Sequence, residues 1–205
     1  NDVDTVKKIP GVKEVTYYTV GNAKIKFKNE IRFVMATAVD LNTANLYFKS
    51  FTVEAEEGRI LKKGDTHDIV IGSQYKHNNF LGKEVKLGDK ILINDVEFEV
   101  KGIMESVGSP PDDRLISMPE PIFRELFNIP ERIDFIIVQV EDTSKINEIA
   151  DRTEKKLLKS RDLTEKTQDF TILTPEEVLA TFGDVLDIVT SFLLGIAAIS
   201  LLVGG

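Results

Sequence analysis

Apolar residues near the start of the chain recur first with a helical period and then with a strand period. Val3, Val6 and Ile9 lie on one helical face before a Pro-Gly turn, so a short helix followed by a strand is expected. Apolar and polar residues then alternate over 24–28 and again over 31–39, where the end of the run becomes continuously apolar. This alternation predicts two further strands.

The middle of the chain, residues 51–118, consists of short β-branched runs separated by turn residues. Glycines and the Asn94-Asp95 pair supply the backbone conformations that tight hairpin turns require. Short helices are expected at 42–49, just before this segment, and at 73–80 within it. The loop at 108–113 contains two consecutive prolines and cannot continue a helix or a central strand. The segment is therefore predicted to be β-rich.

Longer periodic elements follow the middle segment. Apolar positions at helical spacing predict a helix over 122–127, and the nearly continuous apolar run 135–140 is typical of a strand buried on both faces. An amphipathic helix packed on a sheet is expected from residue 144 to 158. After a predicted strand at 169–173, the sequence Thr-Pro-Glu-Glu at 174–177 forms a capping box that starts the final helix.

The final helix runs into an uncharged apolar stretch at the end of the sequence. Residues 188–205 number about 18 and would reach about 27 Å, close to the ~30 Å hydrocarbon core of a bilayer. We expect residues 183–205 to be the start of a transmembrane helix, with membrane lipid around 188–205. A buried C-terminal helix is the alternative. Because the chain opens without methionine, it is expected to be a fragment from which any first span is missing.

Composition excludes several classes of function. The formal net charge is −8, whereas nucleic-acid binding needs clustered Lys and Arg, so no nucleic-acid partner is expected. The chain contains no cysteine, which rules out disulfides, thiolate zinc sites and cysteine nucleophiles. Hydrophobic residues make up 42% and charged residues 29%, which is ordinary for a folded domain.

A few polar side chains have the chemistry of a site. Asp65, His67 and Asp68 offer carboxylate and imidazole groups within one short segment, but adjacent residues of a turn rarely converge on one ion, so a solvated turn is favoured. His77 lies in a polar run and is expected at the surface. Residues 112–114 (Asp-Asp-Arg) would suit calcium or a partner, but calcium needs six to eight oxygens, and an exposed acidic loop is expected.

Signatures of nucleotide binding and serine hydrolysis do not occur in the sequence. There is no Gly-x-Gly-x-x-Gly after a strand, no phosphate loop and no Gly-x-Ser-x-Gly elbow. We therefore predict a non-catalytic domain with no catalytic, cofactor-binding or metal-binding residues and no cofactor.

The order of elements predicts an α+β fold with an insertion. Residues 1–50 and 119–182 form a discontinuous α/β subdomain, residues 51–118 an inserted β-rich subdomain, and residues 183–205 the start of the membrane helix.

Three stretches in this order are similar to one known family. They are Glu-Gly-Arg-Ile at 57–60 followed by Asp65 and the strand 69–72, the segments 81–85 and 98–103, and the terminal run 199–205. Together they resemble the extracytoplasmic core domain of MacB-type ABC transporter permeases, a group that includes lipoprotein-releasing and FtsX-like permeases. The resemblance implies a porter-like α/β subdomain interrupted by a β-rich one, which agrees with the predicted insertion.

The resemblance also implies a location and partners. The domain would lie between the first and second of four spans, in the cell membrane, with residues 1–182 on the extracytoplasmic side. It would work with an ABC-type ATPase and a second permease copy in a homodimer, and with an adaptor or lipoprotein partner. ATP-driven motion of the ATPase would be coupled to export or extraction of substrate outside the membrane.

A lever mechanism follows from this resemblance. If the helix from Pro175 continues into the span, tilting of the span would move the outer domain, and a flexible insertion near Phe182 and Gly183 would uncouple ATP hydrolysis from export. A sensory or adhesive ectodomain is the alternative function. A membrane-tethered hydrolase using the cluster at 65–68 is a third hypothesis.

Overall fold

The computed structural model describes residues 1–204, except for the side chains of residues 184, 185, 195 and 197–204. It divides into two compact units. The first comprises residues 13–139 together with Asn1, and the second comprises residues 2–12 and the chain from residue 140 onward. Each unit is described separately below.

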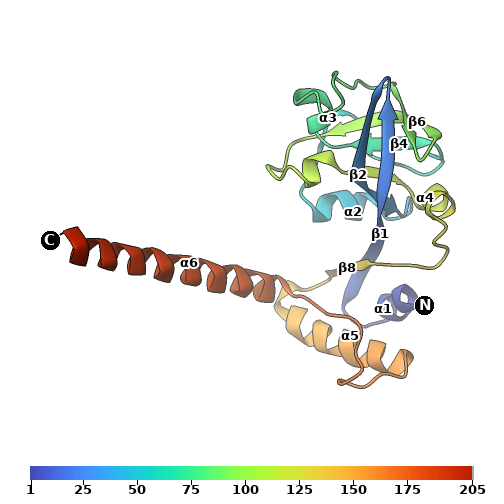
Figure 1. The fold of residues 1–205 in the computed structure, drawn as a ribbon. Helices are drawn as coiled ribbons and strands as arrows, with labels where there is room; N and C mark the ends of the chain where they lie inside the picture. Colours follow the sequence, from blue (N-terminus) through green and yellow to red (C-terminus); the bar gives the residue numbers. More distant parts are fainter. Residues whose placement is uncertain (205) are drawn as a thin grey trace. The chain divides into compact units, whose positions relative to one another are not determined.

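The first unit is built around one eight-stranded sheet (Figure 1). Its strands are β1 (Val12–Phe27), β2 (Glu30–Val39), β3 (Ala55–Gly58), β4 (Asp68–Ile71), β5 (Lys90–Ile93), β6 (Val96–Met104), β7 (Ile116–Pro119) and β8 (Phe135–Val140). Because β1 pairs with both β2 and β5, six strands close into a ring in the order β1-β2-β7-β4-β6-β5. The β2–β7 and β4–β6 pairs are parallel, and the other pairs of the ring are antiparallel.

The interior of this ring is the main hydrophobic core. Alternate residues of a strand point to the same face, so Ile25 and Phe27 of β1 lie on one side of the sheet with Ala36 and Ala38 of β2. All six ring strands contribute buried side chains to this cluster, including Phe98 of β6. Closing the sheet leaves these strands without a free edge and encloses their apolar face.

Helices cover the outside of the first unit. The predicted short helices are confirmed as α2 (Ala44–Ser50), α3 (Gln74–His77) and α4 (Glu120–Phe127), with a 3₁₀ turn η1 at Asp112–Arg114. Tyr47 and Phe48 of α2 form a second core cluster, to which Val70 and Met104 contribute from the sheet. The sheet is therefore apolar on both faces in this region, and one face is covered by only a short helix.

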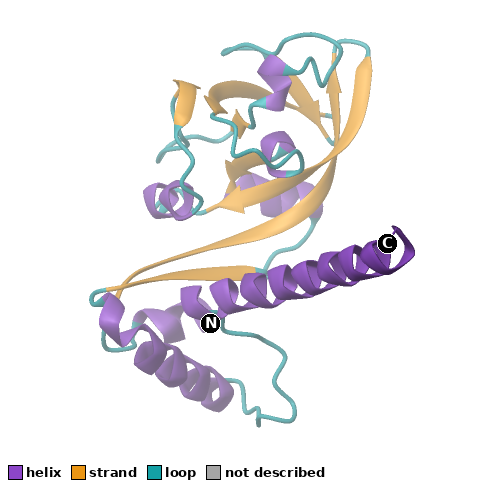
Figure 2. Cartoon of the chain, turned by 90° about the vertical axis from the view of Figure 1, so that its left-hand side faces the viewer, coloured by secondary structure: helices purple, strands orange, loops and turns teal. Residues whose placement is uncertain are grey.

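The second unit is helical. It contains α1 (Asp2–Lys7), the 3₁₀ turn η2 (Thr143–Lys145), α5 (Ile146–Ser160) and α6 (Pro175–Gly204), the long helix that ends at the label C in Figure 2. The predicted helical faces are confirmed, since Val3 and Val6 of α1 are buried and α1 packs on α5, which buries Ile149 and Leu157.

The capping box at the start of α6 is confirmed. The Thr174 backbone N–H donates to Glu177 Oε2 at 2.7 Å, and the Glu177 N–H donates to Thr174 Oγ1 at 3.3 Å. These reciprocal bonds satisfy two backbone donors that a helix start leaves without intrahelical partners. The helix then continues through Gly183 without a break.

We expect Thr174→Ala to weaken the first turn of α6 by about 1 kcal/mol, because the mutation removes the side-chain half of the capping box. Hydrogen exchange of the amides at 176–178 should become about fivefold faster. Thr181→Ala is the matched control, since Thr181 Oγ1 only donates back to the Glu177 carbonyl. Equal effects of the two changes would contradict a capping role for Thr174.

Several predicted elements differ from the structure. The two strands expected before residue 29 are one 16-residue strand, β1, and residues 169–173 are not a strand. The strand expected to be buried on both faces, β8, lies at the end of the sheet next to β1, and Phe135 is 50% exposed. An apolar run has the same pattern in a central and an edge strand, so local sequence could not distinguish them.

The compact units do not separate at the predicted boundaries near 51 and 118. Strands β1 and β2 come from the predicted α/β subdomain, yet they pair with β5 and β7 of the predicted insertion in one ring. The α+β class is confirmed, whereas the division into 1–50 with 119–182 and 51–118 stays a prediction.

Within the described residues, no helix combines the length and apolarity needed to cross a membrane. The predicted membrane segment at 188–205 falls partly on residues outside the described ones. That part of the prediction stays a prediction.

Candidate functional site

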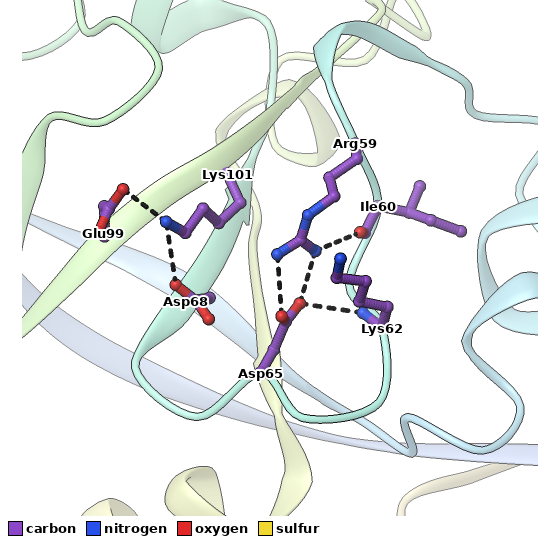
Figure 3. Close-up of polar contacts among 7 residues, drawn as sticks. All are labelled: Arg59, Ile60, Lys62, Asp65, Asp68, Glu99 and Lys101. Carbon is purple, nitrogen blue, oxygen red and sulfur yellow. Dashed lines mark hydrogen bonds and ion pairs between the residues drawn. The ribbon is translucent and has the colours of Figure 1, made fainter.

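The segment that follows β3 is held by an ion pair between a half-buried arginine and a buried aspartate (Figure 3). Arg59 Nη1 and Nη2 donate to Asp65 Oδ2 and Oδ1 at 2.7 and 2.8 Å, and the Lys62 backbone N–H donates to Asp65 Oδ2 at 2.9 Å. Asp65 is 7% exposed, so the predicted solvated turn is wrong at this residue. The reason is that the chain folds back and covers the carboxylate with a guanidinium six residues away.

The backbone geometry requires glycine at position 58, between Glu57 and Arg59. Its φ is +75°, and a Cβ atom would lie 2.2 Å from the Lys101 carbonyl oxygen of β6. Only glycine allows this backbone conformation and this close approach. The motif therefore positions Arg59 for the ion pair, which is a structural role.

Burial alone would raise the pKa of Asp65. The hydrogen bonds from Arg59 and the Lys62 N–H outweigh this effect and hold the pKa of Asp65 below its usual range. At neutral pH the Asp65 carboxylate is therefore charged and already accepts hydrogen bonds from Arg59 and the Lys62 N–H, which makes it a poor general base.

His67 and Asp68 do not converge with Asp65. Asp68 Oδ1 lies 3.6 Å from Lys101 Nζ, and the His67 ring lies 5.4 Å from the Phe98 ring. Among the described residues, no three metal-ligating side chains gather at one point. His77 is at the surface as expected, with Nε2 2.7 Å from Glu56 Oε2.

The acidic loop differs from the prediction at one residue. Asp113 is 5% exposed and accepts hydrogen bonds from Ser106 Oγ at 2.6 Å and the Val107 N–H at 2.8 Å. Its neighbours Asp112 and Arg114 are exposed, as predicted. The carboxylate of Asp113 fixes the loop between β6 and β7 because the loop needs an acceptor for these donors.

Asp113→Ala should destabilise the first unit by about 1–3 kcal/mol, because it removes a buried acceptor of two hydrogen bonds. Asp112→Ala, at the exposed neighbour, should stay within about 0.5 kcal/mol of the wild type. Urea unfolding followed by tyrosine fluorescence would measure both, since the four tyrosines (17, 18, 47 and 75) all lie within residues 13–139. A similar loss for both variants would contradict the anchoring role of Asp113.

A cavity of about 560 Å³ opens on the outer face of the ring in the first unit. Aromatic residues form part of its wall, with Tyr18 stacked on Phe135 at 4.7 Å between ring centroids and lying edge-on to Tyr47 and Phe51 at 5.6 and 5.7 Å. At its buried end, Thr37 Oγ1 forms hydrogen bonds with Tyr47 Oη at 2.9 Å and Ser117 Oγ at 3.1 Å. A cavity of this size and character suits a small organic ligand.

No motif in the sequence predicts this cavity. Its aromatic residues come from positions 18 to 135 and are brought together only by strand pairing and by α2. One local signal was present, since the alternation in β2 placed Ile31, Phe33 and Met35 on one face. Phe33 is 76% exposed and Met35 39% exposed, and Met35 lines the cavity. Apolar residues on both faces of one strand indicate a surface that is not covered by the main core.

Comparison with known proteins gives a consistent family. Residues 1–156 match the MacB-like periplasmic core domain. An uncharacterized ABC transporter permease of Methanocaldococcus jannaschii is 34% identical over 203 residues, which cover 99% of this chain and 50% of that protein. The macrolide export ATP-binding/permease protein MacB of Bdellovibrio bacteriovorus is 26% identical over 216 residues, 100% of this chain and 32% of that protein. The chain thus spans half or less of these two relatives.

Solved structures show the same fold at low sequence identity. The periplasmic region of MacB from Actinobacillus actinomycetemcomitans has a TM-score of 0.70 at 17% identity, covering 89% of this chain and 81% of that one. The extracellular domain of the ABC-type transporter YknZ from Gram-positive bacteria has a TM-score of 0.65 at 18% identity, covering 80% of this chain and 84% of that one. The resemblance seen in the sequence is confirmed, and the chain belongs to the MacB-like periplasmic core domains of ABC transporter permeases.

Proposed function

We propose that this domain transmits ATP-driven motion of a partner ATPase to the export or extraction of substrate outside the membrane, without catalysis of its own. The family match over residues 1–156 carries the proposal, because it identifies the chain as an extracytoplasmic permease domain. The described side chains support a non-catalytic role, since the polar candidates at 59–68 are used in structural ion pairs.

The long helix α6 supports a lever. Its 30 residues, at 1.5 Å each, span about 45 Å in one uninterrupted helix. The capping box fixes the start of this helix, and we propose that its far end, residues 188–205, contacts membrane lipid. Motion of the membrane part would then be transmitted along α6 to the rest of the second unit, because a continuous helix resists bending.

The proposed partners follow from the relatives. The MacB protein of Bdellovibrio bacteriovorus is named as an ATP-binding/permease protein. We therefore propose an ABC-type ATPase as partner of this chain, together with a second permease copy in a homodimer and an adaptor or lipoprotein outside the membrane. Residues 1–182 would lie on the extracytoplasmic side of the cell membrane.

The test uses the full-length parent protein purified in mild detergent and reconstituted in vesicles. ATP hydrolysis is measured with and without residues 1–182, and proteins that co-purify are identified. We expect an ATPase to co-purify and its rate or nucleotide response to change on deletion. Failure to find any ATPase would contradict the proposal and favour a sensory or adhesive ectodomain.

A second experiment tests the lever. A six-residue Gly-Ser insertion after Phe182 is compared with a six-residue Ala insertion at the same position, which keeps the helix. A single spin label is introduced at Lys156, which is exposed on α5 in the second unit, after any cysteine of the parent outside this chain has been replaced. ATP binding should change the distance between labels of two copies in the wild type, and the Gly-Ser insertion should abolish this change while hydrolysis persists. An unchanged response in the Gly-Ser variant would rule out the lever.

A further inference from the structure

The charges around the cavity on the outer face of the ring all have the same sign. Glu105, Asp112 and Asp113 are among its lining residues, and none of the described Lys, Arg or His side chains lines it. Asp113 is occupied by the loop contacts described above. Glu105 and Asp112 are exposed, and within the described part of the chain neither forms an ion pair. Two carboxylates at the mouth are therefore available to a ligand.

The aromatic walls favour the same sign of ligand charge. The faces of Tyr18, Tyr47, Phe51 and Phe135 carry negative electrostatic potential, which attracts cations that are partly removed from water. Burial raises the pKa of Tyr18 to about 12, with further contributions from Tyr47, Asp134 and Asp112. The nearby carboxylates Asp134 and Asp112 contribute to this rise, although burial is its main cause.

We propose that this cavity binds a small hydrophobic organic cation. The apolar body would fill the space between Phe51, Met35 and Val70, and the positive charge would face Glu105 and Asp112. A neutral apolar molecule would gain from burial but not from the carboxylates, and an anion would be repelled. Ligand binding is tested on the isolated chain, so the result does not depend on the proposed coupling to an ATPase.

The probe is a pair of ions with the same shape and opposite charge. Tetraphenylphosphonium and tetraphenylborate are titrated separately into the 205-residue chain by isothermal titration calorimetry at low ionic strength. We expect saturable 1:1 binding of tetraphenylphosphonium that weakens as salt is added, and at least about tenfold weaker binding of tetraphenylborate. Equal binding of both ions, or no saturation by tetraphenylphosphonium up to millimolar concentration, would overturn the proposal.

Variants locate the binding site. The double variant E105Q/D112N keeps the volume of both side chains and should weaken tetraphenylphosphonium binding about tenfold. E14Q/E125Q changes the net charge equally at two exposed acids that do not line the cavity, and should bind like the wild type. Phe51→Leu, at a residue 44% exposed, should weaken binding about threefold through loss of one aromatic face.

The variants also give results that contradict the proposal. If E105Q/D112N and Phe51→Leu both bind tetraphenylphosphonium like the wild type, the ion binds elsewhere and the cavity is not its site. Equal losses in E105Q/D112N and E14Q/E125Q would show an effect of net charge alone. Thermal unfolding of each variant confirms that binding is compared between folded proteins.

Discussion

Replacing Phe98 by alanine should destabilise the first unit by about 3–5 kcal/mol. Phe98 is completely buried inside the ring of strands, where its ring contacts side chains from several strands. The substitution removes a large apolar group and leaves a cavity, because the paired strands around it hold the surrounding backbone in place. Urea unfolding followed by tyrosine fluorescence reports this unit alone, since the second unit contains no tyrosine.

Phe33→Ala is the matched control for Phe98→Ala. Phe33 is also on a ring strand, but its side chain is 76% exposed on the outer face. The same chemical change should therefore alter stability by no more than about 0.5 kcal/mol. A comparable loss for the two variants would show that the interior of the ring is not the main source of stability.

Removing the Arg59 side chain should also destabilise the first unit, in this case for an electrostatic reason. Arg59→Met leaves the Asp65 carboxylate, 4% exposed, without the guanidinium that neutralises it. Arg59 is itself 34% exposed and Asp65 keeps the Lys62 N–H donor, so the loss should be about 2–3 kcal/mol, because the remaining buried charge has lost part of its compensation. The double variant R59M/D65L removes both charges and should recover a substantial part of this loss. Full additivity of the two single changes would contradict a coupled pair.

An exposed ion pair provides the comparison. Lys90 Nζ lies 2.6 Å from Glu97 Oε1, but both side chains are more than half exposed. Lys90→Met should cost less than about 1 kcal/mol, because water already solvates both charges. The two pairs have similar distances, so the difference would come from the burial of Asp65 and from the two parallel hydrogen bonds that Arg59 donates to it.

The Arg59–Asp65 pair also makes stability depend on pH. The pKa of Asp65 is lower in the folded than in the unfolded chain, so the unfolded state binds more protons at acidic pH. The contribution of the pair is fully present above the unfolded pKa of about 4 and is lost as pH falls through the lower folded value. Wild type should thus lose stability more steeply below pH 4 than R59M/D65L. Parallel curves for the two proteins would contradict the lowered pKa.

The burial of Asp65 and Asp113 could not be predicted from the local sequence. The segment 57–65 was recognised as a motif, but its carboxylate was assigned to a solvated turn because a turn of charged residues is usually exposed. Burial of Asp65 depends on Arg59, six residues away, folding over it, and on Gly58 lying against Lys101 of β6, which is a contact between separate segments. Asp113 was misassigned for the same reason, because its partners Ser106 and Val107 lie on the other side of the loop.

The amino-acid sequence by itself determined the local elements and the family. The faces of α1, α4 and α5, the Asn94-Asp95 turn and the capping box at 174–177 follow from periodicity and turn chemistry, which act between residues close in the chain. Three ordered motifs were enough to indicate the MacB-like family, which the comparison confirmed. The tertiary structure alone decided that β1 pairs with β2 and β5 to close a ring, that Asp65 and Asp113 are buried, and that five aromatic residues line an acidic cavity. The physical reason is that strand pairing and burial depend on segments that are distant in sequence, whose alternating patterns fit several partners equally well until the whole chain has packed.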